Sequence, residues 1–265
     1  MGASVGAAAL GNCEQVIWAG DSRSPATHQR AEDAGLTDCD QIDHLFERAD
    51  IIFSVCPPHD AESVAETVST QGFRGVFVDC NAISPTKTKH LAERFERFVD
   101  GGIVGGPAWH ADAGTCLYLS GGEAADIANL FSGSPLHTHV ISSEVGAASA
   151  MKMVFAAYTK GSIALLTAIL GTADHFGVRD TLEAQWGESF AEQTRQRLTG
   201  SSHKAWRFAG EMREIAETFA EAGFPAGFHD AAAEVFARLE GFKDGNADSL
   251  ETLLEELKRS SLRAL

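Results

Sequence analysis

Positive charge is scarce in this sequence of 265 residues. The chain has 21 lysines and arginines against 37 aspartates and glutamates, which gives a formal net charge of −16 at pH 7. An extended nucleic-acid surface and docking on anionic lipid both require a basic surface, so this balance argues against either partner. A local basic pocket for one small anion remains compatible with it.

Cysteine is also sparse, and it is widely scattered. The five cysteines form no C-x-x-C pair, and they stand at Cys13, Cys39, Cys56, Cys80 and Cys116. This spacing and the odd count fit neither a zinc site nor a disulfide framework, so we expect free thiols in a reducing compartment and no metal. No apolar run approaches the ~18 residues that a membrane span needs, and no charged-then-apolar leader opens the chain. We therefore expect a cytoplasmic protein without a membrane partner.

Hydrophobic residues make up 44% of the chain and charged residues 22%, which is the composition of a globular protein. In the first half, short apolar runs alternate with helical patterns. The strand-like segments are 15–19, 50–55, 75–79, 98–104, 116–120 and 138–141, and the helical ones are 25–34, 59–69 and 84–97. This alternation predicts a parallel α/β sheet with right-handed crossovers.

The second half has a different pattern. From Glu144 onward the periodicity is helical, and the segment 146–176 is apolar and rich in small residues. Such a segment is typical of a long helix packed closely against neighbouring helices or against a second subunit. The sequence therefore predicts a Rossmann-type α/β domain over residues 1–143, followed by an all-helical domain over residues 144–265.

Ligands of an open parallel sheet bind at the carboxyl ends of its strands, so the loops after Ala19, Val55, Val78 and Val104 are the places to examine. The chain opens with a helix-like stretch, Met1–Leu10, that resembles the part of a G-x-G-x-x-G fingerprint beyond its second glycine. Gly2 would then be the third glycine. The first strand and the first two glycines are missing, and we expect about ten residues that supply them to precede Met1 in the natural protein.

Three further segments occur in a characteristic order. Val78–Pro85 is a strand that runs into a helix start, Asp100–Pro107 is a glycine-dense turn, and Glu144–Lys152 places a lysine one turn into the long apolar helix. Together they resemble the β-hydroxyacid dehydrogenase family, which includes 3-hydroxyisobutyrate and 6-phosphogluconate dehydrogenases. The resemblance covers nearly the whole chain and is closest to a phosphogluconate dehydrogenase-like subgroup with a variant C-terminal domain.

The resemblance implies roles for particular residues. The family's D-x-S-T-x-x-P loop falls on residues 79–85, where Asn81 replaces the usual serine and would contact both substrate and nicotinamide. The family's D-A-P-V-S-G-G loop falls on residues 100–106, where Gly105 and Gly106 would offer backbone N–H groups to the substrate. The catalytic lysine falls on Lys152. One turn later, where the family has an asparagine that orients the substrate, this sequence has Ala156.

The surroundings of Lys152 support a catalytic role independently. A lysine among Ala148, Met151, Phe155 and Ala156 is desolvated, which lowers the pKa of its ammonium group toward the range useful for proton transfer. The alternative is a lysine that extends from the helix to water and has no chemical role.

Cofactor choice depends on the segment after residues 15–19. An acidic side chain there would hold the ribose hydroxyls of NAD, whereas an arginine accommodates the 2′-phosphate of NADP. The sequence supplies both, with Asp21, Ser22 and Arg23 in one run, and the run Arg23-Ser24-Pro25 favours NADP over NAD. The alternative is a surface helix start whose arginine contacts only solvent. The remaining expected cofactor contacts are Gly2, Val55, Cys56, Pro57 and Asn81.

The resemblance thus implies an oxidoreductase that transfers a hydride between NADP or NAD and a small hydroxy acid or its keto or semialdehyde partner. We expect Lys152 to act as general acid and base, and the protein to form a homodimer. One alternative is a chain that binds a cofactor or a partner without turnover, because the first strand and two glycines are missing. A second alternative is the reduction of imines.

Overall fold

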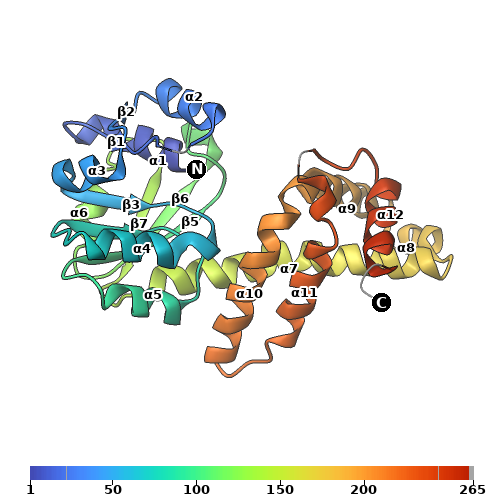
Figure 1. The fold of residues 1–265 in the computed structure, drawn as a ribbon. Coiled ribbons are helices and arrows are strands. Elements are labelled where there is room, and N and C mark those ends of the chain that lie inside the picture. Colours follow the sequence, from blue (N-terminus) through green and yellow to red (C-terminus); the bar gives the residue numbers. More distant parts are fainter. Residues whose placement is uncertain (22, 244, 263–265) are drawn as a thin grey trace. The chain divides into compact units, whose positions relative to one another are not determined.

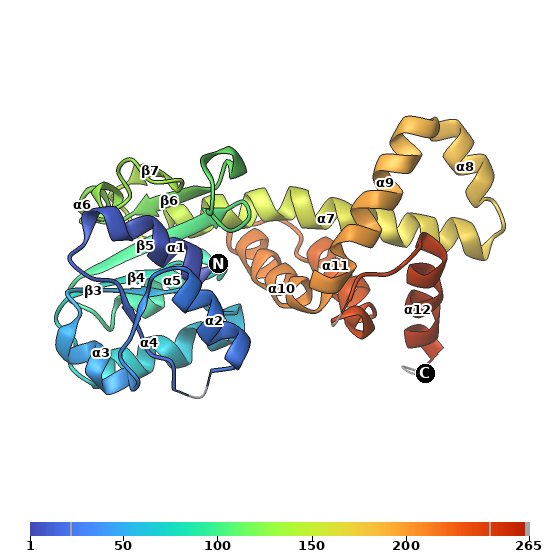
Figure 2. The ribbon, with the colours of Figure 1, turned by 90° about the horizontal axis from the view of Figure 1, so that it is seen from above.

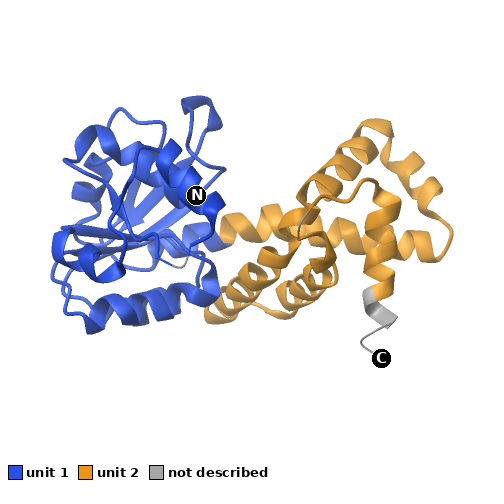
Figure 3. Ribbon diagram, turned by 45° about the horizontal axis from the view of Figure 1, so that its top comes forward, with its two compact units in different colours: residues 1–153 blue, residues 154–265 orange. Residues whose placement is uncertain are grey.

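The structure is a computed structural model that describes residues 1–21, 23–243 and 245–262, with side chains described as far as residue 259. It divides into two compact units, Met1–Met153 and Val154–Leu265 (Figure 3). The division lies between residues 153 and 154 rather than between 143 and 144. It falls inside the long helix α7 (Ala147–His175), whose first turns belong to unit 1.

The strands of unit 1 form two sheets. In the smaller sheet, β1 (Ile17–Trp18) pairs in parallel with β2 (Thr37–Asp38). The larger sheet has the order β3-β4-β5-β6-β7. Its strands are β3 (Ile51–Ser54), β4 (Val76–Asp79), β5 (Phe98–Val104), β6 (Cys116–Ser120) and β7 (His137–Ser142).

The prediction of a wholly parallel sheet is wrong at one pair. β3, β4 and β5 are parallel, but β6 runs antiparallel to β5, and β7 is parallel to β6. The reason lies in the connection between β5 and β6. Residues 105–115 form a loop with one short 3-10 helix (Ala111–Ala113), and parallel neighbours need a longer crossover that carries the chain back along the sheet.

The two sheets are separated between β1 and β3. Among the described residues, each of these strands pairs along one edge only, β1 with β2 and β3 with β4. Helix α1 (Gly2–Ala9) lies near both: a Cβ at Gly6 would lie 3.4 Å from the side chain of Val16, the residue before β1, and Phe53 of β3 packs against the core cluster that contains Val5.

Helices cover both faces of the larger sheet, because successive residues of the fully buried β4 point to opposite sides. On one face, Val76 and Val78 pack with α1 and α6 (Ala124–Asn129). On the other face, Phe77 packs with α4 (Ala61–Thr70) and α5 (Pro85–Ala92). Figure 1 shows α4 and α5 below the sheet and α1 above it. The connecting helices are α2 (Pro25–Asp33) and α3 (Ile42–Arg48), with 3-10 turns at Leu10–Asn12 and Pro58–Asp60.

Helix α5 begins as predicted but ends earlier than residue 97. Ser84 is its N-cap, with its hydroxyl accepting from the Lys87 N–H at 3.4 Å, and Pro85 occupies the first helical position. The helix ends at Ala92. Phe95 then stacks on Phe77, with ring centroids 4.3 Å apart, so the chain packs onto the sheet before β5 begins.

In unit 2 the described regular elements are all helical. They are the rest of α7, α8 (Arg179–Trp186), α9 (Glu188–Ser201), α10 (Ala205–Glu221), α11 (Gly227–Ala237) and α12 (Leu250–Leu262), with 3-10 turns at Ser202–Lys204 and Glu240–Phe242. α10 and α11 lie side by side in both views (Figures 1 and 2). Met212, Ile215 and Phe236 are among the fully buried residues of this unit.

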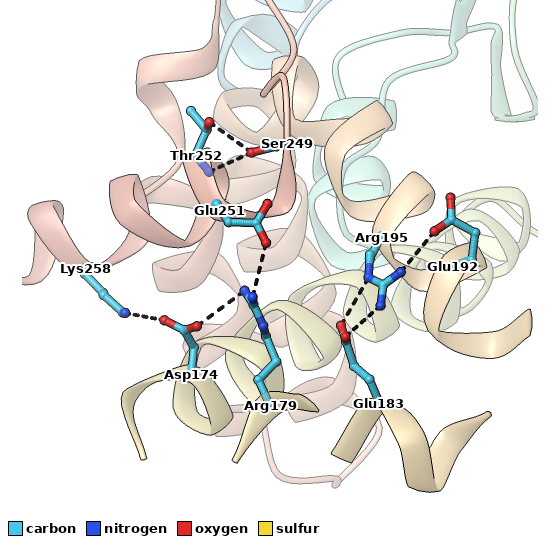
Figure 4. Close-up of polar contacts among 9 residues, drawn as sticks. All are labelled: Asp174, Arg179, Glu183, Glu192, Arg195, Ser249, Glu251, Thr252 and Lys258. Atoms are coloured by element: carbon cyan, nitrogen blue, oxygen red, sulfur yellow. Dashed lines mark hydrogen bonds and ion pairs between the residues drawn. The ribbon is translucent and has the colours of Figure 1, made fainter. Parts of the chain in front are cut away.

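Ion pairs link the ends of the unit 2 helices (Figure 4). Arg179 lies between Asp174 of α7, at 3.3 Å, and Glu251 of α12, at 3.2 Å, and Lys258 also pairs with Asp174. Arg195 of α9 pairs with Glu183 of α8 at 2.7 Å. Each such pair is partly exposed and contributes little individually, so the buried apolar residues supply most of the stability of this unit.

Helix α7 has the length and composition of a membrane span. Its most apolar 18-residue window has a mean hydropathy of 1.6, and 33% of that window is buried. Length and composition alone are weak evidence for a span, because the core helix of a soluble protein passes the same test. Lys152 and Lys160 both lie on this helix.

Candidate functional site

The segments after β1 and β3 meet at one end of α1. A Cβ added to Gly2 would lie 3.9 Å from that of Val55, so the amino-terminal end of α1 lies against the end of β3. The positive charge of Arg23 reaches the Cys56 thiol and lowers its pKa, although burial outweighs this effect and raises that pKa to about 11. The thiol is therefore protonated at neutral pH and is not a nucleophile. Gly2 and Val55 are thus neighbours, and the charge of Arg23 acts on the Cys56 thiol that follows Val55.

The side chain of Asn81 joins the loop after β4, in which it lies, to the loop after β3 through hydrogen bonds. Its side-chain oxygen accepts from the Cys56 N–H at 2.6 Å, and its amide nitrogen donates to Ser54 Oγ at 2.8 Å and to Asp79 Oδ1 at 2.5 Å. The residue is 2% exposed. Its donors and acceptor are bound within the chain, so the side chain of Asn81 holds Cys56 and Pro57 in place rather than presenting its amide to solvent.

Lys152 lies beside β5 because the first turns of α7 are fixed to that strand. Its Nζ donates to the carbonyl oxygen of Ile103 at 2.5 Å. Asp100, on the same strand, accepts from the N–H groups of Gly146 at 2.9 Å and Ser149 at 3.0 Å, which are donors at the start of the helix. A Cβ at Gly102 would lie 2.6 Å from the Ala148 carbonyl oxygen, so only glycine permits this approach.

The glycine loop after β5 is held on two sides. Gly105 has a φ of +120°, and the Thr115 hydroxyl donates to the Gly106 carbonyl at 2.9 Å. The Ala108 N–H donates to Ser4 Oγ of α1 at 3.1 Å. Gly106 is exposed, and a Cβ there would meet no atom within 4 Å. The loop therefore presents open backbone close to the amino-terminal end of α1.

Sequence reasoning missed a carboxylate at the end of β2, beside the end of β1. Asp38 accepts from the Gly20 N–H at 2.9 Å and lies 3.4 Å from His28, which itself contacts the Gly20 carbonyl at 3.0 Å. A Cβ at Gly20 would lie 2.1 Å from this carboxylate. Asp21 and Arg23 are exposed next to it, and Ser22 lies outside the described residues.

Comparison with known proteins assigns the family. Residues 1–132 match the NAD binding domain of 6-phosphogluconate dehydrogenase, and residues 171–239 match a domain of unknown function, DUF1932. A conserved protein of unknown function, MTH1747, whose structure was reported to be similar to 3-hydroxyacid dehydrogenases, is 28% identical. The match covers 91% of this chain and 93% of that one, with a TM-score of 0.63. The chain belongs to the β-hydroxyacid dehydrogenase family.

Other proteins of known sequence or structure are similar to this chain. An uncharacterized 28.5 kDa protein of Methanothermus fervidus is 29% identical over 73% of this chain and 77% of its own. The match to the 3-hydroxyisobutyrate dehydrogenase of Mycobacterium tuberculosis covers 97% of this chain and 96% of that one at 16% identity, with a TM-score of 0.65. The match to an imine reductase of Bacillus cereus covers 97% and 95% at 18% identity, with a TM-score of 0.51.

The residues gathered at the end of α1 fit the nicotinamide dinucleotide that the family fold implies. The start of α1 at Gly2 is suited to a diphosphate, because a helix presents its first N–H groups there. Arg23 and Asp21 are exposed polar groups for the ribose end, and Val55, Cys56 and Pro57 form a neutral, partly buried wall for an aromatic ring.

Proposed function

We propose that this protein is an oxidoreductase that transfers a hydride between NADP, or less readily NAD, and a small 3-hydroxy acid or its keto or semialdehyde partner. The observation that carries the proposal is Lys152. Its half-buried amine donates to the carbonyl oxygen of Ile103 in β5, two residues before the exposed glycine loop that begins at Gly105. The chain also belongs to a family of dehydrogenases.

The cofactor would be held by the residues at the ends of β1 and β3. Gly2 would approach the diphosphate, Asp21 and Arg23 the adenosine ribose with its 2′-phosphate, and Val55 to Pro57 the nicotinamide. Ser22 belongs to the same proposed set. When bound, the nicotinamide supplies the acceptor or donor of the hydride.

The chain's own residues would bind the substrate and move its proton. The N–H groups of Gly105 and Gly106 would bind its carboxylate, because backbone donors in an exposed glycine turn can approach an anion closely. The Lys152 amine would take the hydroxyl proton as the hydride leaves and return it in the reverse direction. Asn81 would act on the nicotinamide and substrate through Cys56, whose N–H it holds.

A screen of 3-hydroxy acids with NADP and with NAD tests this function, following the absorbance of the reduced nicotinamide. We expect reduction of the cofactor by at least one hydroxy acid, faster with NADP. Tight cofactor binding without turnover of any substrate would instead favour a protein that binds without catalysis. Turnover limited to carbonyl compounds supplied with amines would favour imine reduction.

We further propose that the protein is a cytoplasmic homodimer. Several large apolar side chains of unit 2 are exposed, including Leu165 at 45%, Phe176 at 72% and Val178 at 49%. Ala168, Ile169, Thr172, Ala173, Phe176, Val178 and Leu182 line an apolar groove with a volume of about 400 Å³. Such a surface favours a second copy of the chain as its partner.

A further inference from the structure

Four polar residues form a row across the larger sheet. Ser54 of β3, Asp79 of β4, Asp100 of β5 and Ser120 of β6 are register partners, and each is at most 4% exposed. Partners in register lie on the same face, and neighbouring strands are about 4.8 Å apart. Two carboxyl groups therefore lie side by side in the interior, where two negative charges are costly.

The two carboxyl groups differ in the donors that reach them. Asp100 Oδ2 accepts from Ser120 Oγ at 2.9 Å and from the N–H groups of Gly146 and Ser149, and Oδ1 accepts from Ser149 Oγ at 2.7 Å. Burial raises the pKa of Asp100, but these bonds oppose that effect. The start of a helix also favours a negative charge. Of the two carboxyl groups, Asp100 is thus the one better able to hold a negative charge.

Asp79 lacks comparable partners. Its Oδ1 accepts from Asn81, while its Oδ2 is buried without a hydrogen-bond partner among the described residues. Burial and, to a smaller extent, the charge of Asp100 raise the pKa of Asp79 to about 7, against hydrogen bonds from the side chain and the backbone of Asn81. The thiols near it are those of Cys56 and Cys80. Burial raises the pKa of both, so they stay protonated in this range.

We propose that Asp100 keeps its negative charge while Asp79 takes up a proton as the pH falls, and that Asp79 is a positioning residue whose protonation loosens the Asn81–Cys56 link. Ionised Asp79 can only accept, so it fixes the amide of Asn81 with its nitrogen toward Asp79 and its oxygen toward the Cys56 N–H. If Oδ1 carried the proton, its O–H would face the N–H of the Asn81 amide, and two donors cannot bond to each other. If Oδ2 carried the proton, that O–H would have no acceptor among the described residues. Either protonated form weakens the link.

The consequence is a pH-dependent loop at the proposed cofactor site. The segment 55–57 should be held firmly above pH 7 and more loosely below it. That segment 55–57 contacts the cofactor rests on the proposed function, but the hydrogen bonds that join Asp79, Asn81 and Cys56 do not. The inference can therefore be tested without substrate or cofactor, and its failure would leave the proposed oxidoreductase activity untouched.

Backbone hydrogen exchange of Cys56 in the full chain measures the link directly. After correction for the intrinsic pH dependence of exchange, we expect protection of this N–H to rise about tenfold between about pH 5.5 and 8.5, the factor expected for one charge-assisted bond. The midpoint should lie near pH 7. In Asp79→Asn the pH dependence should disappear, because the amide accepts from Asn81 but does not titrate.

The matched control is Asp60→Asn. The charge of Asp60 also acts on the Cys56 thiol, but its side chain is half exposed, so this variant should keep the pH dependence. Titration of the carboxyl carbons in the unmodified protein serves if Asp79→Asn does not fold. Asp79 should then titrate near 7 while Asp100 stays ionised. A midpoint below about 5 for Asp79, titration of Asp100 near 7, or an unchanged pH dependence in Asp79→Asn would overturn the proposal.

Discussion

At the scale of single residues, the bond from Lys152 to the Ile103 carbonyl holds the amine at a fixed point along β5. If this amine transfers the proton, Lys152→Ala should lower turnover by about 10²- to 10⁴-fold and leave cofactor affinity nearly unchanged. Lys152→Arg should restore little activity, because a guanidinium stays charged and cannot accept the proton. Steady-state kinetics and fluorescence titration with NADPH measure the two effects. Turnover above about a third of the wild-type value in Lys152→Ala would contradict the role.

Arg23 is the residue on which cofactor choice should depend. It is exposed at the start of α2, and its charge reaches Cys56 in the neighbouring loop. A charge-assisted bond to a 2′-phosphate contributes about 1.5–3 kcal/mol, so Arg23→Ala should weaken NADPH binding about 10- to 100-fold and leave NADH binding little changed. Calorimetry with both cofactors measures this. Arg30→Ala, which changes an arginine of the same helix bonded to Thr27, should affect neither cofactor. Equal losses for both cofactors in Arg23→Ala would exclude the phosphate contact.

At the scale of elements, the contact between β5 and the start of α7 determines where Lys152 lies. A Cβ at Gly102 would approach the Ala148 carbonyl oxygen to 2.6 Å and the Lys152 Cβ to 3.1 Å. Gly102→Ala should therefore push the helix from the strand, lower the free energy of unfolding by about 1–3 kcal/mol and reduce turnover as well. Urea unfolding measures the stability. Gly122→Ala is the control, since a Cβ there meets no atom within 4 Å, and it should leave stability nearly unchanged. Equal stability of the two variants would show that α7 is not held this closely.

Sequence patterns predicted most strands and helices of unit 1 close to their observed ranges, but they missed β2, α3 and α6. α7 and the buried strands β3, β4 and β5 lie close to their predicted ranges, because each carries a continuous apolar signal. β2 has only two residues, both exposed, so it leaves no such signal. The direction of β6 was also beyond prediction, because an apolar run indicates burial but not which way the strand runs.

The same limit explains which parts of the site sequence analysis could find. Lys152 and the glycines of 105–106 stand in motifs that are local in sequence. Asp100 was assigned only as the start of a loop, although it caps α7 across a sequence separation of 46 residues to Gly146. The neighbourhood of Asp79 and Asp100 depends on strand register, and register is fixed by packing of the whole sheet rather than by any short segment.

At the scale of the whole molecule, the proposed dimer would form against the net charge of −16 that each chain carries. Two copies repel each other at long range, and salt screens this repulsion, whereas burial of the apolar groove in unit 2 does not depend on it. Dimerisation should therefore strengthen as salt is raised from about 0.01 M to about 0.5 M, which sedimentation velocity at several protein concentrations measures.

The groove itself can be tested with two exposed phenylalanines. Phe176 lines it and is 72% exposed, so Phe176→Asp should cost the folded unit little but place a charge in the interface and shift the protein toward monomer. Phe224 is 64% exposed and does not line the groove, so Phe224→Asp should leave the mass unchanged. Light scattering after size exclusion gives both masses. A dimer that persists in Phe176→Asp, or one lost equally in both variants, would mean that the copies meet through another surface.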